Sequence, residues 1–335
     1  MLDTVPDSAN HALTWVAPAD LPEAFVEGTM TGSYVGPHSD DLLRGAALYT
    51  YGGVWMDVGC ILFRHLHSIC WAQLGDDASS FSVAAPLVFG QFIANHIVAS
   101  RKGDEFMKNW CVIRVPQPKS TELTVNRHLI FLELWKGRTD FTGVLQSPLI
   151  NFITWMKFED LVEAGFGWSW KLDEQTIIGY IGQCVAWMRL TWLQEPNGSF
   201  NGVNYWANKV LLWSVLPEDF PAENTIGFDG ADILNVFATR LDGNGNEAGF
   251  EKAVWTMMAQ SVMQKITHGK ELTHKPHCGT LLDLPEHEGK DAAPETFGEL
   301  LRYGSVHLEQ TREMQYVTAA VVDPEFVIHK GLLEA

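Results

Sequence analysis

The chain has 335 residues, 46% of them hydrophobic and 19% charged, which is enough apolar material for a sizeable core in one large domain. Its formal net charge of −18 argues against a protein that coats nucleic acid, and we expect no DNA partner. The five cysteines are odd in number and irregularly spaced, which indicates a reducing compartment rather than a disulfide framework.

The first 150 residues alternate helical and strand patterns. Ser39 or Asp40 can cap a helix over about 40–50, and the Gly52-Gly53 pair ends it. A short buried strand over 54–58 follows, then a strand and turn over 61–75 and a further strand over 81–89. The pattern predicts helices over 95–110 and about 122–136. This alternation favours an α/β layered domain.

The remainder of the chain is more helical. It contains predicted helices over 156–165, 173–193, 204–214 and 250–268, and a loop-like tail from about 269. We therefore divide the chain into an α/β core over 1–150 and a mostly helical half over 151–335. The second half is expected to complete the site within the same structural unit.

Two segments bear on localisation. Residues 1–20 have neither the basic region nor the apolar region of a signal peptide. The most apolar long stretch, TIIGYIGQCVAWMRLTWL at 176–193, contains Gln183 and Arg189 and is shorter than the roughly 20 residues that span a bilayer. We predict a soluble, cytoplasmic protein with no membrane partner.

The stretch HSDDLLRGAALYTYGGVWMDVG at 38–59 carries the chemistry. Asp41 and Arg44 lie three apart on one helical face, and an Arg there can donate two hydrogen bonds to a phosphate, a carboxylate or a pair of hydroxyls. The glycine pair allows a close backbone approach or a positive φ. Asp57 ends a buried strand, at the edge of an α/β sheet where ligands bind. By spacing alone, an ordinary helix salt bridge and a turn cap explain the same residues.

This run resembles the signature of nucleotide-sugar transferases with a GT-A fold, including the capsular-polysaccharide-synthesis-like proteins with a sugar-binding DxD region. The matching positions are Asp41, Arg44, Tyr51, Gly52, Gly53, Trp55 and Asp57. NHIVASRKGDEFMKNW at 95–110 resembles the next family element, an Asn followed by a helix over the donor site. The resemblance implies a mixed sheet flanked by helices, with substrate contacts from Asp40, Asp41, Arg44, Gly52, Gly53, Trp55 and Asn95.

Gly59 departs from the family pattern, because it stands where the second metal-binding Asp of the DxD motif is expected. Loss of a hard oxygen ligand weakens a Mg²⁺ or Mn²⁺ site and leaves the negative charge of a diphosphate less compensated. We therefore assign no metal site and no cofactor. Mg²⁺ or Mn²⁺ enters only if the chain transfers sugar.

The basic residues are concentrated in one segment. Residues 1–100 carry two Arg and no Lys against ten Asp or Glu, whereas residues 101–138 carry eight Lys or Arg against four. A solvated helix face explains such an island, and so does a polyanion partner. Under the second interpretation, the patch that binds charged tRNA comprises Arg101, Lys102, Lys108, Arg114 and Lys119.

Three functions fit these features, two of them transferase activities. The first is an aminoacyl-tRNA-dependent cyclodipeptide synthase, because one fungal branch of the capsular-type family is similar in size. It would use Arg-tRNA and a second aminoacyl-tRNA, with Asp57 or His38 as the base that deprotonates the attacking amine. The alternative is a glycosyltransferase that moves a sugar from a nucleotide donor to a small acceptor. The third is an inactive binding module on the same fold.

Overall fold

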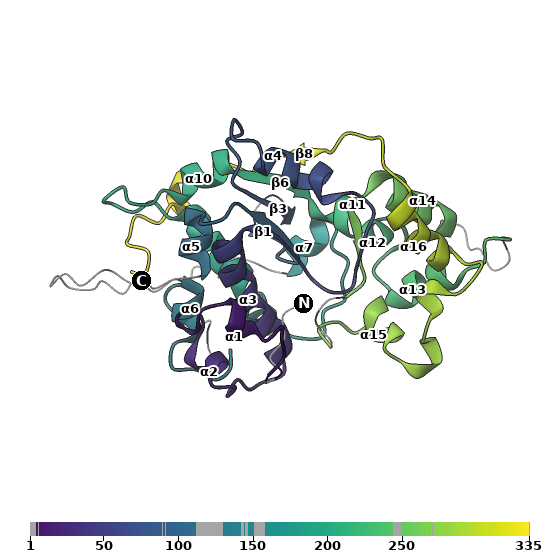
Figure 1. The fold of residues 1–335 in the computed structure, drawn as a ribbon, viewed down its shortest axis with the longest axis horizontal. Helices are drawn as coiled ribbons and strands as arrows, with labels where there is room; N and C mark the ends of the chain where they lie inside the picture. Colours follow the sequence, from purple (N-terminus) through teal and green to yellow (C-terminus); the bar gives the residue numbers. More distant parts are fainter. Residues whose placement is uncertain are drawn as a thin grey trace.

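The structure is a computed structural model. It describes residues 5, 7–88, 90, 92–111, 130–141, 144, 147–150, 158–243, 249–267, 269 and 271–334. A central mixed sheet lies in the middle of the molecule, and helices cover it (Figure 1). This is the mixed α/β architecture that the GT-A-like resemblance predicts. In the described part of the chain, no helix is long and apolar enough to cross a bilayer.

The central sheet joins strands from both halves of the chain. Its order is β1-β5-β3-β6-β8, and the short β4 also pairs with β3. Only the β3–β6 pair is parallel among the described pairs of this sheet; the others are antiparallel. A second, two-stranded sheet pairs β2 with β7. The strands are β1 (Gly53–Met56), β2 (Cys60–Leu62), β3 (Val83–Val88), β4 (Phe92–Ile93), β5 (Ile97–Ser100), β6 (Val210–Ser214), β7 (Met263–Lys265) and β8 (Tyr316–Val317).

The alternation of side chains along a strand separates two cores. Val83 and Ala85 of β3 join the larger core, which includes much of the helical layer, whereas Ala84 between them joins a smaller core on the other face. All six residues of β3 are buried, as expected of a strand that helices cover on both faces. The sheet is therefore a rigid platform whose edges can hold functional groups.

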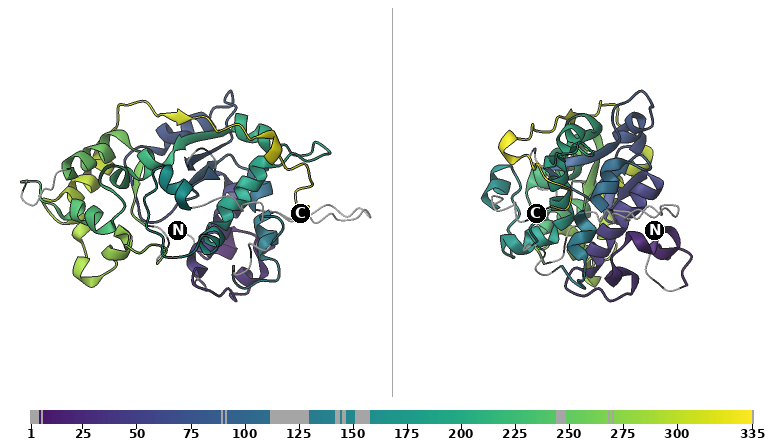
Figure 2. Two further views of the ribbon diagram at one scale, coloured as in Figure 1. Left: turned by 180° about the vertical axis from the view of Figure 1, so that it is seen from behind. Right: turned by 90° about the vertical axis from the view of Figure 1, so that its left-hand side faces the viewer.

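The helices fall into two groups along the chain. The first comprises α1 (Ala12–Trp15), α2 (Glu23–Val26), α3 (Val35–Tyr51), α4 (Ala72–Leu74), α5 (Glu105–Cys111), α6 (Ile130–Trp135), α7 (Phe158–Glu163), α8 (Glu174–Tyr180), α9 (Gly182–Trp192) and α10 (Gly202–Lys209). The second comprises α11 (Val215–Asp219), α12 (Pro221–Ile226), α13 (Gly230–Ala238), α14 (Phe250–Gln260), α15 (Cys278–Leu282) and α16 (Phe297–His307). Helices α13 to α16 gather at one end of the molecule in opposite views (Figures 1 and 2).

The predicted helix over 40–50 is confirmed and is longer than expected, because it begins at Val35. Gly52 ends it with a φ of +67°, and its N–H donates to the Leu48 carbonyl at 2.8 Å. A Cβ at Gly52 would lie 2.6 Å from the Lys102 backbone nitrogen. Glycine is therefore required here both by backbone conformation and by the close approach of a neighbouring segment.

Three predicted helices are partly strands. Residues 95–110 contain β5 before α5, residues 204–214 contain α10 and then β6, and residues 250–268 contain α14 and then β7. In each case a helix and the short apolar strand next to it were predicted as one helix. The periodicity of so short an apolar run does not distinguish a helix from a strand. The tail after 269 is also more ordered than expected, because it contains α15, α16 and β8.

Candidate active site

Arg44 is the centre of a buried group of polar side chains. The Arg44 side chain is 2% exposed, and its Nη1 donates to Asp41 Oδ1 at 2.6 Å and to Gln183 Oε1 at 2.5 Å. Its Nη2 donates to Asp40 Oδ2 at 2.7 Å and to Asp57 Oδ1 at 2.8 Å. Helical spacing on α3 puts Asp40 and Asp41 beside Arg44, while Asp57 arrives from the end of β1. We call these five residues the Arg44 cluster.

Asn95 and Gln183 join the cluster to two further elements. Asn95 Nδ2 donates to Asp41 Oδ1 and to Gln183 Oε1, both at 2.9 Å. Gln183, on α9, is fully buried and donates its Nε2 to the backbone carbonyl of Asp41. The polar groups of α3, α9 and the β4–β5 connection are thereby fixed relative to one another. Arg44 Nε has no hydrogen-bond partner among the described residues, but the remaining bonds of this buried network hold its members in one geometry.

Lys265 is a second cation at Asp57. Its Nζ lies 2.9 Å from Asp57 Oδ2, and the two side chains are 8% and 24% exposed. The β2–β7 pairing places Lys265 opposite Cys60, three residues after Asp57. Burial alone would raise the pKa of Asp57, but the charges of Lys265 and Arg44 outweigh it and lower this pKa to about 2. Asp57 therefore remains a carboxylate at all physiological pH values.

Asp40 has the opposite shift. Burial, together with the negative charges of Asp57 and Asp41, raises its pKa to about 6, although Arg44 opposes the change. Its side chain is 43% exposed, more than those of Asp41 (10%) and Asp57 (24%). Asp40 is thus the carboxylate of the cluster that titrates near neutral pH and can reach a ligand from the open side.

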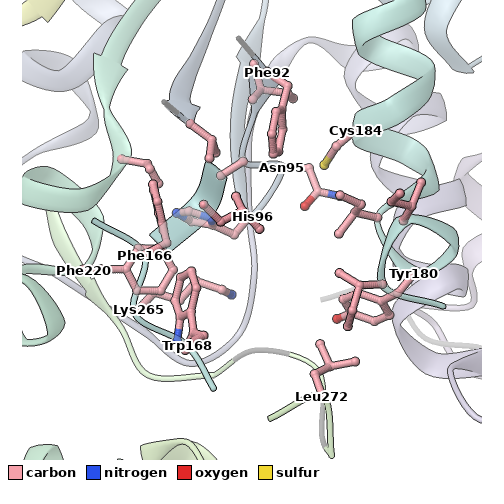
Figure 3. A pocket seen from close by; sticks show the side chains of 18 of the residues that line it. Phe92, Asn95, His96, Phe166, Trp168, Tyr180, Cys184, Phe220, Lys265 and Leu272 are labelled. Carbon is pink, nitrogen blue, oxygen red and sulfur yellow. The ribbon is translucent and has the colours of Figure 1, made fainter. Parts of the chain in front are cut away.

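Two hollows meet at this cluster. The polar cavity has a volume of about 790 Å³, and its lining includes Asp40, Asp41, Arg44, Asp57, Asn95, Lys265, Tyr34, Tyr180, Thr267 and Glu271. The apolar pocket beside it has a volume of about 210 Å³. Figure 3 shows Phe166, Trp168 and Phe220 on one side of the apolar pocket, with Tyr180 and Leu272 across from them. The arrangement suits a ligand with one charged, hydroxyl-rich part and one apolar part.

The residues at the degenerate DxD motif do not fit a divalent cation. Both oxygens of Asp57 already accept hydrogen bonds, from Arg44 and Lys265, and these two positive charges oppose a third. Gly59 has a φ of +83°, and a Cβ there would lie 2.5 Å from Thr267 Cγ2. Because Thr267 fills that space, no carboxylate ligand can stand at position 59 without a shift. Among the described residues, no group of three or more His, Cys, Asp or Glu side chains could hold a metal ion.

The structure brings together five of the predicted site residues and leaves others apart. Asp40, Asp41, Arg44, Asp57 and Asn95 all line the polar cavity. The remaining four of the nine residues given catalytic or substrate-binding roles are absent from its lining: His38, Gly52, Gly53 and Trp55.

His38 and Trp55 lie behind the cluster. His38 is 5% exposed, with the rings of Trp135, Phe141 and Tyr180 around it, and its Nδ1 lies 3.7 Å from Asp41 Oδ2. The Trp55 ring packs beside Arg44, whose Cζ lies 5.8 Å from the ring centroid. Both residues therefore support the cluster from outside the cavity.

The predicted tRNA patch does not form part of the cavity lining. Arg101 donates to the backbone carbonyl of Asp76 at 2.6 Å, which directs it to a loop. Lys102 is exposed and Lys108 is half-buried on α5, and none of the three lines the polar cavity. Arg114 and Lys119 lie outside the described residues.

Four polar side chains in or beside the site were not predicted from the sequence. Gln183 could have been found as a polar residue within a long apolar run. Lys265 fell inside a segment predicted to be helical, and its partner Asp57 is 208 residues away. His96 and Asp219, which form a buried pair with 2.9 Å between Nε2 and Oδ2, have no local motif. Contacts over such sequence separations become visible only in the fold.

Comparison with known proteins identifies relatives along the full chain. It is 40% identical over 340 aligned residues to the probable glycosyltransferase FCK3 of Fusarium pseudograminearum, covering 100% of this chain and 80% of the relative. It is 32% identical to the O-glycosyltransferase braB of Annulohypoxylon truncatum, covering 100% and 77%. It is 31% identical to the O-glycosyltransferase PaGT of Phomopsis amygdali, covering 95% and 75%. No family model and no solved structure matches the chain.

These relatives correct the leading functional prediction. The prediction of an aminoacyl-tRNA-dependent cyclodipeptide synthase is wrong, because the curated relatives are named glycosyltransferases. The relatives favour the alternative, sugar transfer. Without the tRNA-dependent activity, nothing supports a tRNA partner. The error came from weighting Gly59 and the basic segment, neither of which distinguishes the two reactions. The chain belongs to a family of fungal glycosyltransferases.

Proposed function

We propose that this protein transfers a sugar from a nucleoside diphosphate donor to a hydroxyl group of a small-molecule acceptor. The observation that carries the proposal is the arrangement of three carboxylates, Asp40, Asp41 and Asp57, and two cations, Arg44 and Lys265, around one polar cavity. The names of braB and PaGT, both O-glycosyltransferases, support an oxygen acceptor.

The cluster offers separate groups for the two parts of the donor. Carboxylates accept hydrogen bonds from sugar hydroxyls, and Asp40 is the most exposed acceptor of the three. An ammonium has three donors, and in the described residues Lys265 Nζ bonds only Asp57. Its other two donors are available to diphosphate oxygens. We assign Asp40 and Asp41 to the sugar and Lys265 to the diphosphate.

The same arrangement supports donor binding without a cofactor. A diphosphate needs compensating positive charge as its bond to the sugar breaks. Lys265 and Arg44 are fixed, hydrogen-bonded cations, and Lys265 lines the cavity next to the carboxylate that the DxD motif supplies. We propose that Lys265 provides this compensation and that Mg²⁺ or Mn²⁺ is not required.

The proposal is tested by calorimetric titration with UDP-glucose, UDP-N-acetylglucosamine and GDP-mannose in EDTA, followed by assays of nucleoside diphosphate release. We expect one of these donors to bind and to be consumed in EDTA. Lys265→Met removes the ammonium assigned to the diphosphate and should lower donor affinity at least tenfold, whereas Lys275→Met, at an exposed position, should leave it unchanged. Binding without any release would support a binding module. Absence of binding to all three donors would refute the proposed function.

A further inference from the structure

The apolar pocket is continuous with the candidate donor site. Five residues line both hollows: Asp57, Asn95, Tyr180, Ile181 and Lys265. The remaining wall of the pocket is mainly apolar and aromatic, with Phe166, Trp168 and Phe220 among its members (Figure 3). A ligand held in this pocket would therefore lie beside the diphosphate-binding groups rather than at a distant surface.

This remaining wall has one carboxyl and one imidazole group, those of the half-buried Glu174 and of His96. His96 is 3% exposed, and its Nε2 lies 2.9 Å from Oδ2 of the fully buried Asp219. Asp219 Oδ1 accepts a second hydrogen bond, from Trp213 Nε1 at 3.0 Å, so the carboxylate is held at both oxygens. With Asp219 accepting from Nε2–H, the other ring nitrogen, Nδ1, carries the lone pair. In the described part of the chain, the hydrogen-bond partner of the His96 ring is Asp219, through Nε2.

The backbone fixes His96 next to the donor site. The N–H of Asp57 donates to the carbonyl of His96 at 2.8 Å. This bond lies one residue beyond the last pair of the antiparallel β1–β5 pairing, Met56 with Ile97. His96 follows Asn95, which is bonded to the Arg44 cluster. The imidazole thus belongs to the same rigid sheet edge as Asp57. A base that must take a proton from an acceptor hydroxyl at the boundary of two hollows requires this kind of support.

The volume of the pocket limits what it can receive. An apolar cavity of about 150 Å³ is large enough to bind benzene. The volume of about 210 Å³ therefore suits an aliphatic or aromatic body of one to two rings. A sugar or a peptide would bury hydroxyl or amide groups against Phe166, Trp168 and Phe220 without partners, which is unfavourable.

We propose that the apolar pocket binds the ring body of an alcohol acceptor and that His96 is the base that takes the proton from its hydroxyl. The proposal rests on the proposed function. In the transfer step, the acceptor O–H bond breaks and its proton moves to Nδ1 of His96. The acceptor oxygen bonds to the anomeric carbon of the sugar. The bond from that carbon to the diphosphate oxygen breaks, and its electron pair leaves with the diphosphate. Asp219 stabilises the imidazolium until the proton passes to solvent.

The acceptor class is tested with 2-naphthylmethanol, a two-ring body with one aliphatic hydroxyl, and with glycerol as a polar comparator. The donor is the nucleotide sugar found by calorimetry, and the glycoside is measured by chromatography and mass spectrometry. We expect the naphthyl glycoside to form at least tenfold faster than glyceryl glycoside at equal acceptor concentration. Equal rates, or no naphthyl glycoside while the donor is consumed, would overturn the apolar acceptor.

Two variants with matched controls test the residues. Ala94→Leu fills part of the pocket and should raise the KM for 2-naphthylmethanol at least tenfold, whereas Ala72→Leu on the exposed surface of α4 should not. His96→Gln should lower kcat by about a hundredfold or more with little change in that KM. The exposed His67→Gln is its control.

Chemical rescue separates a base from a structural role. His96→Gly should regain part of its transfer rate when imidazole is added, and a variant that still binds the nucleotide sugar is folded. If donor binding is intact but His96→Gln retains the wild-type kcat, or imidazole restores nothing to His96→Gly, His96 is not the base. If the wild-type protein binds none of the three nucleotide sugars, the proposed function itself fails. Donor binding therefore distinguishes failure of the proposed function from failure of His96 as the base.

Discussion

Replacing Lys265 by Met tests the electrostatic account of the site. Met keeps an unbranched apolar side chain in the buried position but removes the ammonium that lies 2.9 Å from Asp57 Oδ2. The pKa of Asp57 falls from 3.8 to about 2 in spite of burial, and Lys265 is the leading charge that lowers it. A shift of nearly two pH units corresponds to about 2 kcal/mol in favour of the ionised, folded form.

The sign of the pH dependence follows from the lowered pKa. A carboxylate whose pKa is lowered on folding contributes stability that is present above pH 4 and lost as the pH falls towards 2. We expect Lys265→Met to lower the free energy of unfolding by on the order of 2 kcal/mol at pH 7. The difference from wild type should shrink between pH 4 and pH 2, because protonated Asp57 no longer needs the ammonium.

The assay is urea unfolding of both proteins at pH 7, 5, 4 and 3, with Lys275→Met as the control. Lys275 also pairs with a carboxylate, Asp229 at 2.7 Å, but its side chain is 59% exposed, so its loss should barely change stability. If Lys265→Met were as stable as wild type at pH 7, or equally destabilised at pH 7 and pH 3, the Lys265–Asp57 pair would not have the role assigned here.

Three further outcomes are expected. Gly59→Ala should cost roughly 1–3 kcal/mol of stability in urea unfolding, because φ is +83° and the new Cβ meets Thr267 at 2.5 Å; Gly28→Ala, with φ of +67° and open space, should cost less. Donor affinity measured by calorimetry should rise from pH 5 to pH 7 as Asp40 ionises near pH 6, and Asp40→Asn should flatten this profile; an unchanged profile contradicts the role of Asp40. Burial raises the pKa of Glu223 to about 7, so its contribution to stability is lost as the pH rises through 7. Relative to wild type, Glu223→Gln should gain on the order of 3 kcal/mol between pH 5 and pH 8, and a constant difference would argue against a buried charge at this position.

The helix and carboxylates of the motif were predictable because the relevant interactions are local. Asp40, Asp41 and Arg44 lie within one turn of an amphipathic helix, so their spacing alone brings them to one face. Asp57 was predictable because a short apolar strand after a glycine turn leaves its last residue at a sheet edge. The resemblance to GT-A transferases rests on this same local run.

The strands β5, β6 and β7 were missed because their identity depends on their neighbours. β5 is four buried residues that pair with β1 and β3, and β6 forms the parallel pair with β3. Neither has an alternating pattern, because both faces are covered, and such runs resemble buried helix. The sheet pairing supplies hydrogen bonds that the isolated segments lack.

The sequence by itself determined that this chain has an α/β core and that Asp40, Asp41, Arg44 and Asp57 belong to one site, because short spacing and a contiguous motif encode them. The resemblance of residues 95–110 to the next family element added Asn95. Only the tertiary structure decided which groups complete the site. Gln183 lies 139 residues after its partner Arg44, and Lys265 lies 208 residues after its partner Asp57. His96 pairs with Asp219 across 123 residues. Contacts over such separations are set by sheet order and helix packing, which no local pattern of residues specifies.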